Sequence, residues 1–339
     1  MRGRIGLVML AVGLAVLPGR AQQDGGADVR FRMRTSVELV MIPVTVKDST
    51  GDLVIGIERD EFRLFEDGVE QTIRYFSIDP FPLSVIILVD AGLGRGAQAA
   101  VRKALPVFVS AFGPEDEFAL YLFHTYARRV LGFSRDRDKL HAAFRALELM
   151  RAPARRGGST GGPMTAGPRI NSIPIGPQVP SVSPRSEKPT KAIHDALWTA
   201  GLALHDRERG RRRVVFIISD GANSRLNQYS FKETRDLLLR ENVSVYAIGV
   251  GNARFALGTT VLSDYARVTG GDMYAPLGRD GLARMYARVA EQARNQYTLV
   301  YAPPPARAGR KFRNIEVRVR RPGVTLLTYD GYFAGIPTE

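Results

Sequence analysis

Two stretches of the sequence decide the fold: SVIILVD at residues 84–90 and VVFIISD at residues 214–220. Each is a continuous apolar run, rich in β-branched residues, that ends on an aspartate. Continuous runs of this kind are typical of strands buried on both faces of a parallel sheet, whereas half-exposed strands alternate. We therefore predict two buried parallel strands, with Asp90 and Asp220 at their carboxyl ends.

Helical and strand patterns alternate around these two stretches. Helices are predicted at 97–112, 139–150, 193–205, 231–241, 260–268 and 282–294, and further strands at 118–124, 127–133, 243–250 and 273–275. This alternation predicts an α/β domain at 82–295 with a doubly wound, mostly parallel sheet. Only a tight turn separates 118–124 from 127–133, so we expect one antiparallel edge strand.

Shorter strand patterns lie on either side of this domain. Residues 30–78 hold a β-branched run at 37–46 and two strand-like runs, at 62–66 and 70–77, on either side of the hairpin signal Asp67-Gly68. Residues 296–334 hold three further strand-like runs. Neither segment is large enough to form a stable core alone. We expect the two segments to pair into a small antiparallel β unit, with the α/β domain inserted between them.

Residues 151–191 interrupt the α/β pattern. Pro, Gly and Ser make up 19 of these 41 residues and no apolar periodicity is visible, so we expect a flexible insertion. The insertion carries a net charge of +6, and residues 294–321 carry +7, so the formal +14 of the 339-residue chain is local. The insertion has no aromatic residue of the kind that forms a stacking platform, which argues against a specific nucleic-acid partner.

The N-terminal residues have the pattern of an export signal. Arg2 and Arg4 precede an apolar run of 13 residues, and small residues at Gly19 and Ala21 suit a cleavage site. The run is short for a membrane span, which takes about 20 residues. We expect residues 1–21 to be a signal peptide, the mature protein to be periplasmic or extracellular, and no transmembrane helix to remain. An uncleaved anchor is the alternative.

The order of these elements, with Asp90 and Asp220 at strand ends, resembles a von Willebrand factor type A domain. The motifs that strengthen the resemblance are FRLFEDG at 62–68, Ser219-Asp-Gly221, Val268-Thr-Gly-Gly271, the segment 296–303 and Asp330-Gly-Tyr332. Together they are similar to the VWFA-related family abundant in Acidobacteria, over residues 36–334 without the insertion. The resemblance implies a binding or adhesion role rather than an enzymatic one.

Type A domains often carry a metal-ion-dependent adhesion site, in which carboxylates and hydroxyls hold Mg²⁺. The resemblance implies that Asp90, Thr190 and Asp220 would surround the metal here, with Mn²⁺ or Ca²⁺ as other candidates. Hard cations of this kind take oxygen ligands, and an acidic residue of a partner can supply the last one.

The sequence departs from that pattern at three positions. Gly92 and Gly94 stand where the family has serines, and the family spacing puts Lys191 at the threonine position. Two hydroxyl ligands are therefore missing, and an ammonium would repel a cation. We expect a degenerate site with weak metal binding. The alternative is that Lys191 neutralises both carboxylates as a structural ion pair.

Three functions remain open from the sequence. The first is an exported, non-enzymatic adhesion-type module that presents the strand-end face to a protein or cell-surface partner. The second is a metal-independent envelope scaffold that contacts partners through the basic insertion at 151–191. The third is a hydrolase or nucleotide-binding enzyme, but Gly92-Leu-Gly-Arg-Gly96 misses the dinucleotide spacing and no G-x-S-x-G elbow is present. The absence of cysteine also excludes thiolate chemistry.

Overall fold

The computed structural model describes residues 39–110, 112–149, 169–170, 173–174, 191–208, 210–251, 253, 260–275, 279–304 and 312–334. The expected signal peptide, Thr190 and nearly all of the 151–191 insertion lie outside these residues. The described helices are α1 (Arg95–Ser110), α2 (Arg137–Leu149), α3 (Ile193–Leu204), α4 (Phe231–Arg240), α5 (Val261–Val268), α6 (Arg279–Arg294) and the 3₁₀ helix η1 (Arg59–Glu61).

The strands of the described residues form three larger sheets and one short hairpin. They are β1 (Val40–Lys47), β2 (Phe62–Glu66), β3 (Val69–Gln71), β4 (Tyr75–Ser77), β5 (Leu83–Asp90), β6 (Glu117–Phe123), β7 (Ala127–Ser134), β8 (Arg169–Ile170), β9 (Ile173–Pro174), β10 (Arg212–Ser219), β11 (Val243–Gly249), β12 (Met273–Tyr274), β13 (Tyr297–Tyr301), β14 (Phe312–Val319), β15 (Thr325–Leu327) and β16 (Gly331–Phe333). Strands β8 and β9 pair only with each other.

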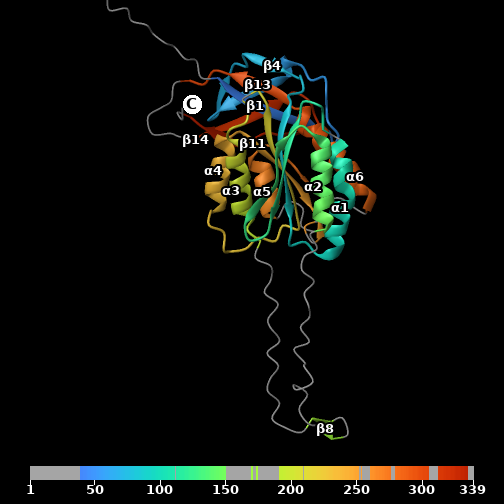
Figure 1. The fold of residues 1–339 in the computed structure, drawn as a ribbon. Helices are drawn as coiled ribbons and strands as arrows, with labels where there is room; N and C mark the ends of the chain where they lie inside the picture. The colour runs from blue at the N-terminus through green and yellow to red at the C-terminus, as the bar shows by residue number, and fades with distance from the viewer. Residues whose placement is uncertain are drawn as a thin grey trace, which may run out of the picture. The chain divides into compact units, whose positions relative to one another are not determined.

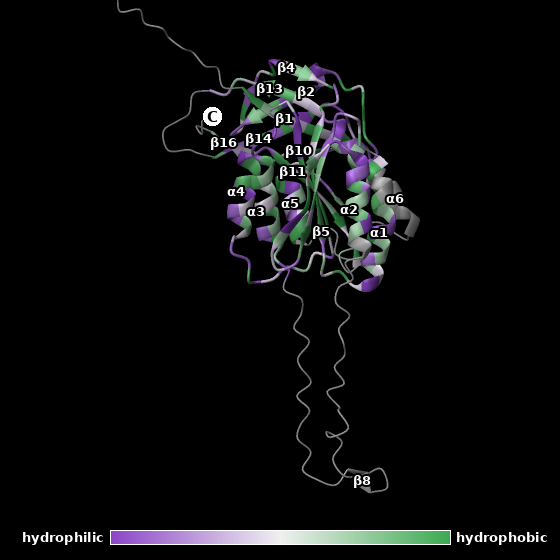
Figure 2. Cartoon of the chain, viewed as in Figure 1, coloured by the Kyte–Doolittle hydropathy of each residue, from purple (hydrophilic) through white to green (hydrophobic). Residues whose placement is uncertain are grey.

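The central sheet has the strand order β12-β11-β10-β5-β6-β7. All neighbouring strands run parallel except β7, which pairs antiparallel with β6 at the edge. Every residue of β5 is buried, as the continuous apolar run requires, and Figure 2 shows the strand in the colour of hydrophobic residues. The predicted fold class is confirmed, including the single antiparallel edge strand.

Three of the described helices cover each face of this sheet. Helices α1, α2 and α6 lie on one face and α3, α4 and α5 on the other, as Figure 1 shows. Alternate β5 side chains pack against the two helical layers. Val85 and Ile87 belong to the core beneath α1, and Ile86 and Leu88 belong to the core beneath α3. A strand buried on both faces cannot alternate in polarity, which explains the sequence pattern.

Two four-stranded antiparallel sheets form a base at one end of the α/β layers (Figure 1). Their strand orders are β15-β1-β13-β4 and β16-β14-β2-β3, so each sheet combines strands from both ends of the chain. The segments before and after the α/β domain therefore pair as expected, but as two packed sheets around a shared core rather than one.

The base differs from the expectation after the Asp67-Gly68 turn. The sequence pattern predicts one strand over residues 70–77, whereas the structure divides it into β3 and β4, which belong to different sheets. The crossing point is marked by Ile73, whose side chain enters the core, and by Arg74, whose N–H donates to the carbonyl of Val300 at 2.7 Å.

Arg212, at the start of β10, connects the α/β layers to the base. Its guanidinium donates to the carbonyl of Gln296 at 2.8 Å and to the Thr298 hydroxyl at 3.0 Å, next to and within β13. The base thus lies at the amino ends of the parallel strands and does not cover their carboxyl ends. Among the described residues, no helix has the length and apolar character needed to cross a membrane.

Candidate functional site

The candidate site lies at the carboxyl ends of β5 and β10. The chain leaves β5 toward α1 on one face of the sheet, and it leaves β10 toward α4 on the other face. Ligands of open α/β sheets bind where neighbouring connections diverge in this way. Asp90 is the last residue of β5 and Asp220 directly follows β10, so the structure brings the two predicted carboxylates together.

Asp90 is buried and both of its carboxylate oxygens are engaged. The backbone N–H of Gly92 donates to Oδ1 at 2.7 Å, and the hydroxyl of Ser219 donates to Oδ2 at 2.7 Å. Ser219 and Asp90 lie side by side because β10 pairs in register with β5. These bonds compensate the burial of the carboxylate and fix its orientation.

Lys191 lies between the two aspartates. Its Nζ is 2.9 Å from Oδ2 of Asp90 and 2.7 Å from Oδ2 of Asp220, and the side chain is only 2% exposed. These are distances of charge-assisted hydrogen bonds. The structure therefore has the arrangement in which the lysine ammonium neutralises the carboxylates, leaving one formal negative charge on the cluster.

The described residues of this cluster do not fit a divalent cation. Mg²⁺ takes about six oxygen ligands close to 2.0–2.1 Å. The Lys191 ammonium fills the position between the carboxylates, and Gly92 and Gly94 offer no side-chain oxygen. No group of three or more histidine, aspartate or glutamate side chains converges anywhere in the described part of the chain.

The third predicted ligand, Thr190, lies outside the described residues. The assignment of Asp90, Thr190 and Asp220 as metal ligands therefore stays a prediction. The contacts of Lys191 with the two aspartates argue against it.

The absence of a side chain at residue 92 makes room for Lys191. A Cβ atom at Gly92 would lie 2.7 Å from Cδ2 of His124 and 2.9 Å from Cε of Lys191. Both distances are well inside ordinary van der Waals contact. Glycine at position 92 and lysine at position 191 are therefore complementary in volume as well as in charge.

The backbone of Lys191 is held by the two loops on either side. Its carbonyl accepts a hydrogen bond from the N–H of Ser224 at 2.6 Å, and the N–H of Ala192 donates to the carbonyl of His124 at 2.8 Å. Residue 191 thus joins the loop after β6 to the loop after β10. The ammonium is positioned by backbone contacts that do not depend on any ligand.

Two asparagines that the sequence analysis missed hold the loop after β10 against α3. Asn223 Oδ1 accepts from the N–H of Ile193, and Asn227 Oδ1 accepts from the N–H of His194, both at 3.0 Å. The residue before α3, Ala192, makes no side-chain cap of its own, so the asparagines satisfy free N–H groups of the first turn from another loop. Asparagines in a strand-to-helix loop are the only signal for this contact in the sequence.

The loop after β10 is also held at its C-terminal end, at Gln228 and Tyr229. The carboxylate of Asp195 accepts hydrogen bonds from the N–H groups of Gln228 and Tyr229, both at 3.0 Å. Burial lowers the pKa of the neighbouring His194, and the Asp195 carboxylate partly opposes this shift. The loop is thus fixed at several points between residues 223 and 229, and the face it presents is preorganised.

Two large apolar side chains stand out from this face. Tyr126, in the turn between β6 and β7, is 71% exposed, and Leu226, in the loop after β10, is 74% exposed. The only charged residue of the loop segment 221–229 is Arg225, and Arg95 begins α1 on the β5 side; both are exposed. Outside the Lys191 cluster, these loops therefore present cationic and apolar groups.

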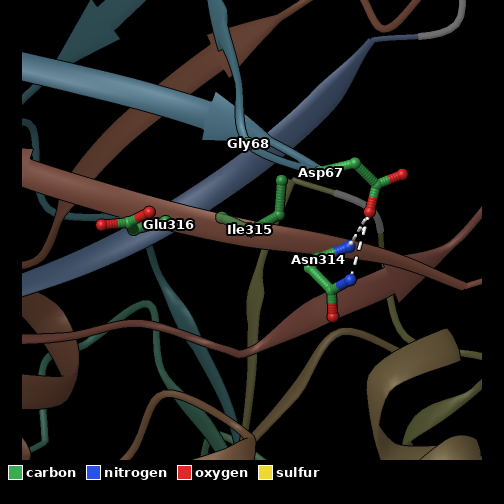
Figure 3. A pocket seen from close by; sticks show the side chains of 5 residues that line it. All are labelled: Asp67, Gly68, Asn314, Ile315 and Glu316. Carbon is green, nitrogen blue, oxygen red and sulfur yellow. Dashed lines mark hydrogen bonds between the residues drawn. The ribbon is translucent and has the colours of Figure 1, made fainter.

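A shallow hollow in the base, shown in Figure 3, is explained by a turn rather than by a ligand. It is lined by Asp67, Gly68, Asn314, Ile315 and Glu316. Asp67 and Gly68 both have positive φ, and Asp67 Oδ1 accepts from the N–H and the side-chain amide of Asn314, each at 3.1 Å. Asp67 and Asn314 thus bond each other and fasten the hairpin turn between β2 and β3 to β14, while the Glu316 carboxylate accepts from Arg318.

Comparisons with known proteins agree with this architecture. The family model described as von Willebrand factor type A domain matches residues 83–160 and 183–275, which is half of the chain. No curated protein matches the sequence.

Several solved structures are similar at low sequence identity. BatB from Bacteroides thetaiotaomicron, titled a conserved hypothetical protein, is 13% identical, with 62% of this chain and 98% of that chain covered and a TM-score of 0.41. A von Willebrand factor type A protein from Catenulispora acidiphila is 10% identical, with 90% and 77% covered and a TM-score of 0.45. Proximal thread matrix protein 1 from the mussel byssus, solved with a zinc-occupied MIDAS motif, is 18% identical, with 67% and 49% covered and a TM-score of 0.41.

Proposed function

This chain belongs to the von Willebrand factor type A domain family, and from that premise we propose that it is an exported protein that binds a protein partner through the face beyond the carboxyl ends of β5, β6 and β10. We name this surface the strand-end face and define it by the loops at 91–94, 124–126 and 221–229. The partner is a protein or cell-surface segment that carries acidic and apolar side chains.

The observation that carries the proposal is the exposure of Tyr126 and Leu226 on loops that are otherwise fastened. Exposed tyrosine and arginine side chains on a preorganised surface are typical of binding hot spots, and Leu226 adds apolar contact area beside them. Little conformational entropy is lost when such a surface binds, because its loops are already ordered. Arg95 and Arg225 add a positive potential that favours an acidic partner.

The chemistry of the face supports binding rather than catalysis. The Asp90 carboxylate is bonded to Ser219, Gly92 and Lys191, so it is not poised to act as a base. Export, proposed from residues 1–21, would place the face in the periplasm or outside the cell. The intact mass of protein recovered from that fraction tests this part, since removal of residues 1–21 predicts a new N-terminus at Gln22.

The binding test is a comparison of two double variants in a pull-down from envelope extracts of the source organism, followed by direct titration of the captured partner. Tyr126→Ala with Leu226→Ala removes the apolar pair of the strand-end face. Ile55→Ala with Val69→Ala removes two comparably exposed side chains of the base and is the matched control.

We expect the first variant to lose at least about tenfold in affinity, as hot-spot truncations do, and the control to bind like the wild type. Raising the salt concentration should weaken binding further, because part of the attraction is between exposed charges. Equal binding by both variants would contradict the proposal. If deletion of residues 151–190 alone abolished binding, the basic insertion rather than the strand-end face would be the contact.

A further inference from the structure

We propose that the ammonium of Lys191 is a built-in replacement for a divalent cation, so that the strand-end site is permanently occupied and independent of metal. This inference concerns the same face as the proposed function, but it rests on the contacts of the cluster and not on the identity of a partner. It can therefore stand or fall separately.

The first argument is the position of the charge. Nζ of Lys191 contacts one oxygen of each aspartate, at 2.9 Å and 2.7 Å, and thus takes the place that a cation bridging Asp90 and Asp220 would need. A divalent ion approaching the same oxygens would meet a positive charge within a few ångströms, in surroundings that screen poorly. Metal and ammonium are therefore alternative occupants.

The second argument is the state of the remaining ligand atoms. The other oxygen of Asp90 accepts from the N–H of Gly92, and the other oxygen of Asp220 accepts from the N–H of Ala222 at 3.1 Å. The hydroxyl of Ser219 donates a hydrogen bond to Asp90 at 2.7 Å. The described oxygens of the cluster are therefore already directed to protein donors.

The third argument is volume. A Cβ atom at residue 92 would lie 2.9 Å from Lys191 Cε and 2.7 Å from the His124 ring, so a hydroxyl-bearing residue at 92 would require these side chains to shift. A Cβ atom at Gly94, by contrast, would meet nothing within 4 Å. The loss of a side chain at residue 92 and the presence of lysine at residue 191 thus form one coupled replacement.

The fourth argument is burial. The Lys191 side chain is 2% exposed, so a carboxylate of a partner cannot reach the ammonium without opening the site. Binding at the strand-end face would then use the surrounding side chains and not a shared ion. Chelators would leave it unchanged.

The experiment measures thermal stability and calorimetric metal binding of the purified protein, without any partner. For the wild type, Mg²⁺ or Mn²⁺ up to millimolar concentration, and EDTA, should leave Tm unchanged and give no saturable heat. Saturable binding by the wild type that disappears in Asp220→Asn would overturn the inference, and this arm needs no lysine variant to fold.

A second experiment removes the ammonium with a lysine variant and asks whether a metal ion can take its place. Lys191→Ala should lower Tm by roughly 5–10 °C, because it leaves the buried Asp90 carboxylate unpaired. Mn²⁺ should bind this variant saturably and restore part of the lost Tm. A lysine variant that neither loses stability nor gains a response to Mn²⁺ would show that the ammonium is not acting as the cation of this site.

The coupling of residues 92 and 191 gives a further control. Gly92→Ser alone should lower Tm, because of the collision with Lys191 and His124. In the Gly92→Ser/Lys191→Ala double variant, the serine should cost less, and Mn²⁺ should raise Tm more than in Lys191→Ala. Additive effects of the two substitutions would contradict the coupled replacement.

Partner binding by the wild type that survives EDTA would connect the metal-independent site to the proposed function. If no partner were found, the stability and metal-binding results would still test the role of Lys191.

Discussion

Nδ1 of His194 lies 2.7 Å from the hydroxyl oxygen of Tyr265, which ties the first turn of α3 to α5 behind the strand-end face. The other ring nitrogen, Nε2, is 2.9 Å from the side-chain amide nitrogen of Asn223. The Oδ1 of that asparagine accepts from backbone and side-chain donors, so its nitrogen is the group that faces the ring. Nε2 must therefore accept, and the arrangement requires the neutral imidazole.

Stability should fall at mildly acidic pH because of His194. Its pKa is lowered in the folded protein by burial, so the unfolded chain binds the proton more readily. The contribution of the neutral ring is complete above the ordinary histidine pKa of about 6.5 and is lost as the pH falls below it. Urea unfolding at a series of pH values should show this slope in the wild type and a flatter one in His194→Gln.

A second histidine provides the matched control for that series. His205 is exposed and its Nδ1 is 2.9 Å from the Glu241 carboxylate. His205→Gln should retain the loss of stability below pH 6.5. If His194→Gln retained it too, another group would be responsible.

Gly271→Ala should destabilise the protein by about 3 kcal/mol or more, the range of severe overpacking. A Cβ atom at this position would lie 1.9 Å from the carbonyl oxygen of Val245, so backbone would have to move. Gly94→Ala, where a Cβ atom meets nothing within 4 Å, is the control and should change stability by no more than about 0.5 kcal/mol. Chemical denaturation of both variants measures the difference, and similar values for the two would refute the close-approach argument.

Arg212→Lys should weaken the connection between the α/β layers and the base. The guanidinium reaches the carbonyls of residues 293, 294 and 296 as well as two side-chain acceptors, and burial lowers its pKa to about 10. Lysine has three donors and no planar fork, so it cannot bond all of these acceptors. We expect a loss of about 2 kcal/mol in the free energy of unfolding.

The same exchange at the exposed Arg225 is the control for this variant. It should leave the free energy of unfolding within about 0.5 kcal/mol of the wild type. Equal stability of Arg212→Lys and the wild type would mean that the forked geometry is unimportant.

Arg313→Met alone should lower the free energy of unfolding more than the Glu66→Gln/Arg313→Met double variant does. Arg313 forms a buried ion pair with Glu66, whose other oxygen accepts from the hydroxyls of Tyr301 and Tyr332. Loss of the arginine alone leaves a buried carboxylate without its counter-charge, at a cost of about 3–5 kcal/mol. The Glu66→Gln/Arg313→Met double variant should recover part of that loss, as a double-mutant cycle by urea unfolding will show. A double variant that simply adds the two single effects would contradict the pairing.

The buried strands of the central sheet could be predicted from the sequence because their environment is uniform. Residues 85–89 and 214–218 are apolar throughout because both faces of β5 and β10 are covered, and the aspartate that follows each run lies at the end of the covered part. That is sufficient to place Asp90 and Asp220 at one edge of the sheet. It is not sufficient to place Lys191, because the sequence before residue 191 has no apolar periodicity; only the family spacing assigned this lysine to the site.

The β base was harder to predict because its contacts are distant in sequence. Residues 53–57 have a strand-like composition, but only Leu53 forms an isolated bridge, and the N–H of Ile57 donates to the hydroxyl of Tyr297 at 3.0 Å. The backbone there is satisfied by a side chain from the other end of the chain. Likewise, the break between β3 and β4 is set by pairing with β13, which local patterning does not reveal.

The pairing of β1 and β2 with β13, β14 and β15 also constrains how the protein is made. A chain synthesised from its N-terminus releases the first strands of the base long before their partners. Until residues 312–334 are synthesised, β2 has only the three-residue β3 as a pairing partner, and its apolar side chains lack the cover of β14. The C-terminal strands therefore complete the two sheets of the base last. A nascent or truncated chain without them is the form that a chaperone or a protease would recognise.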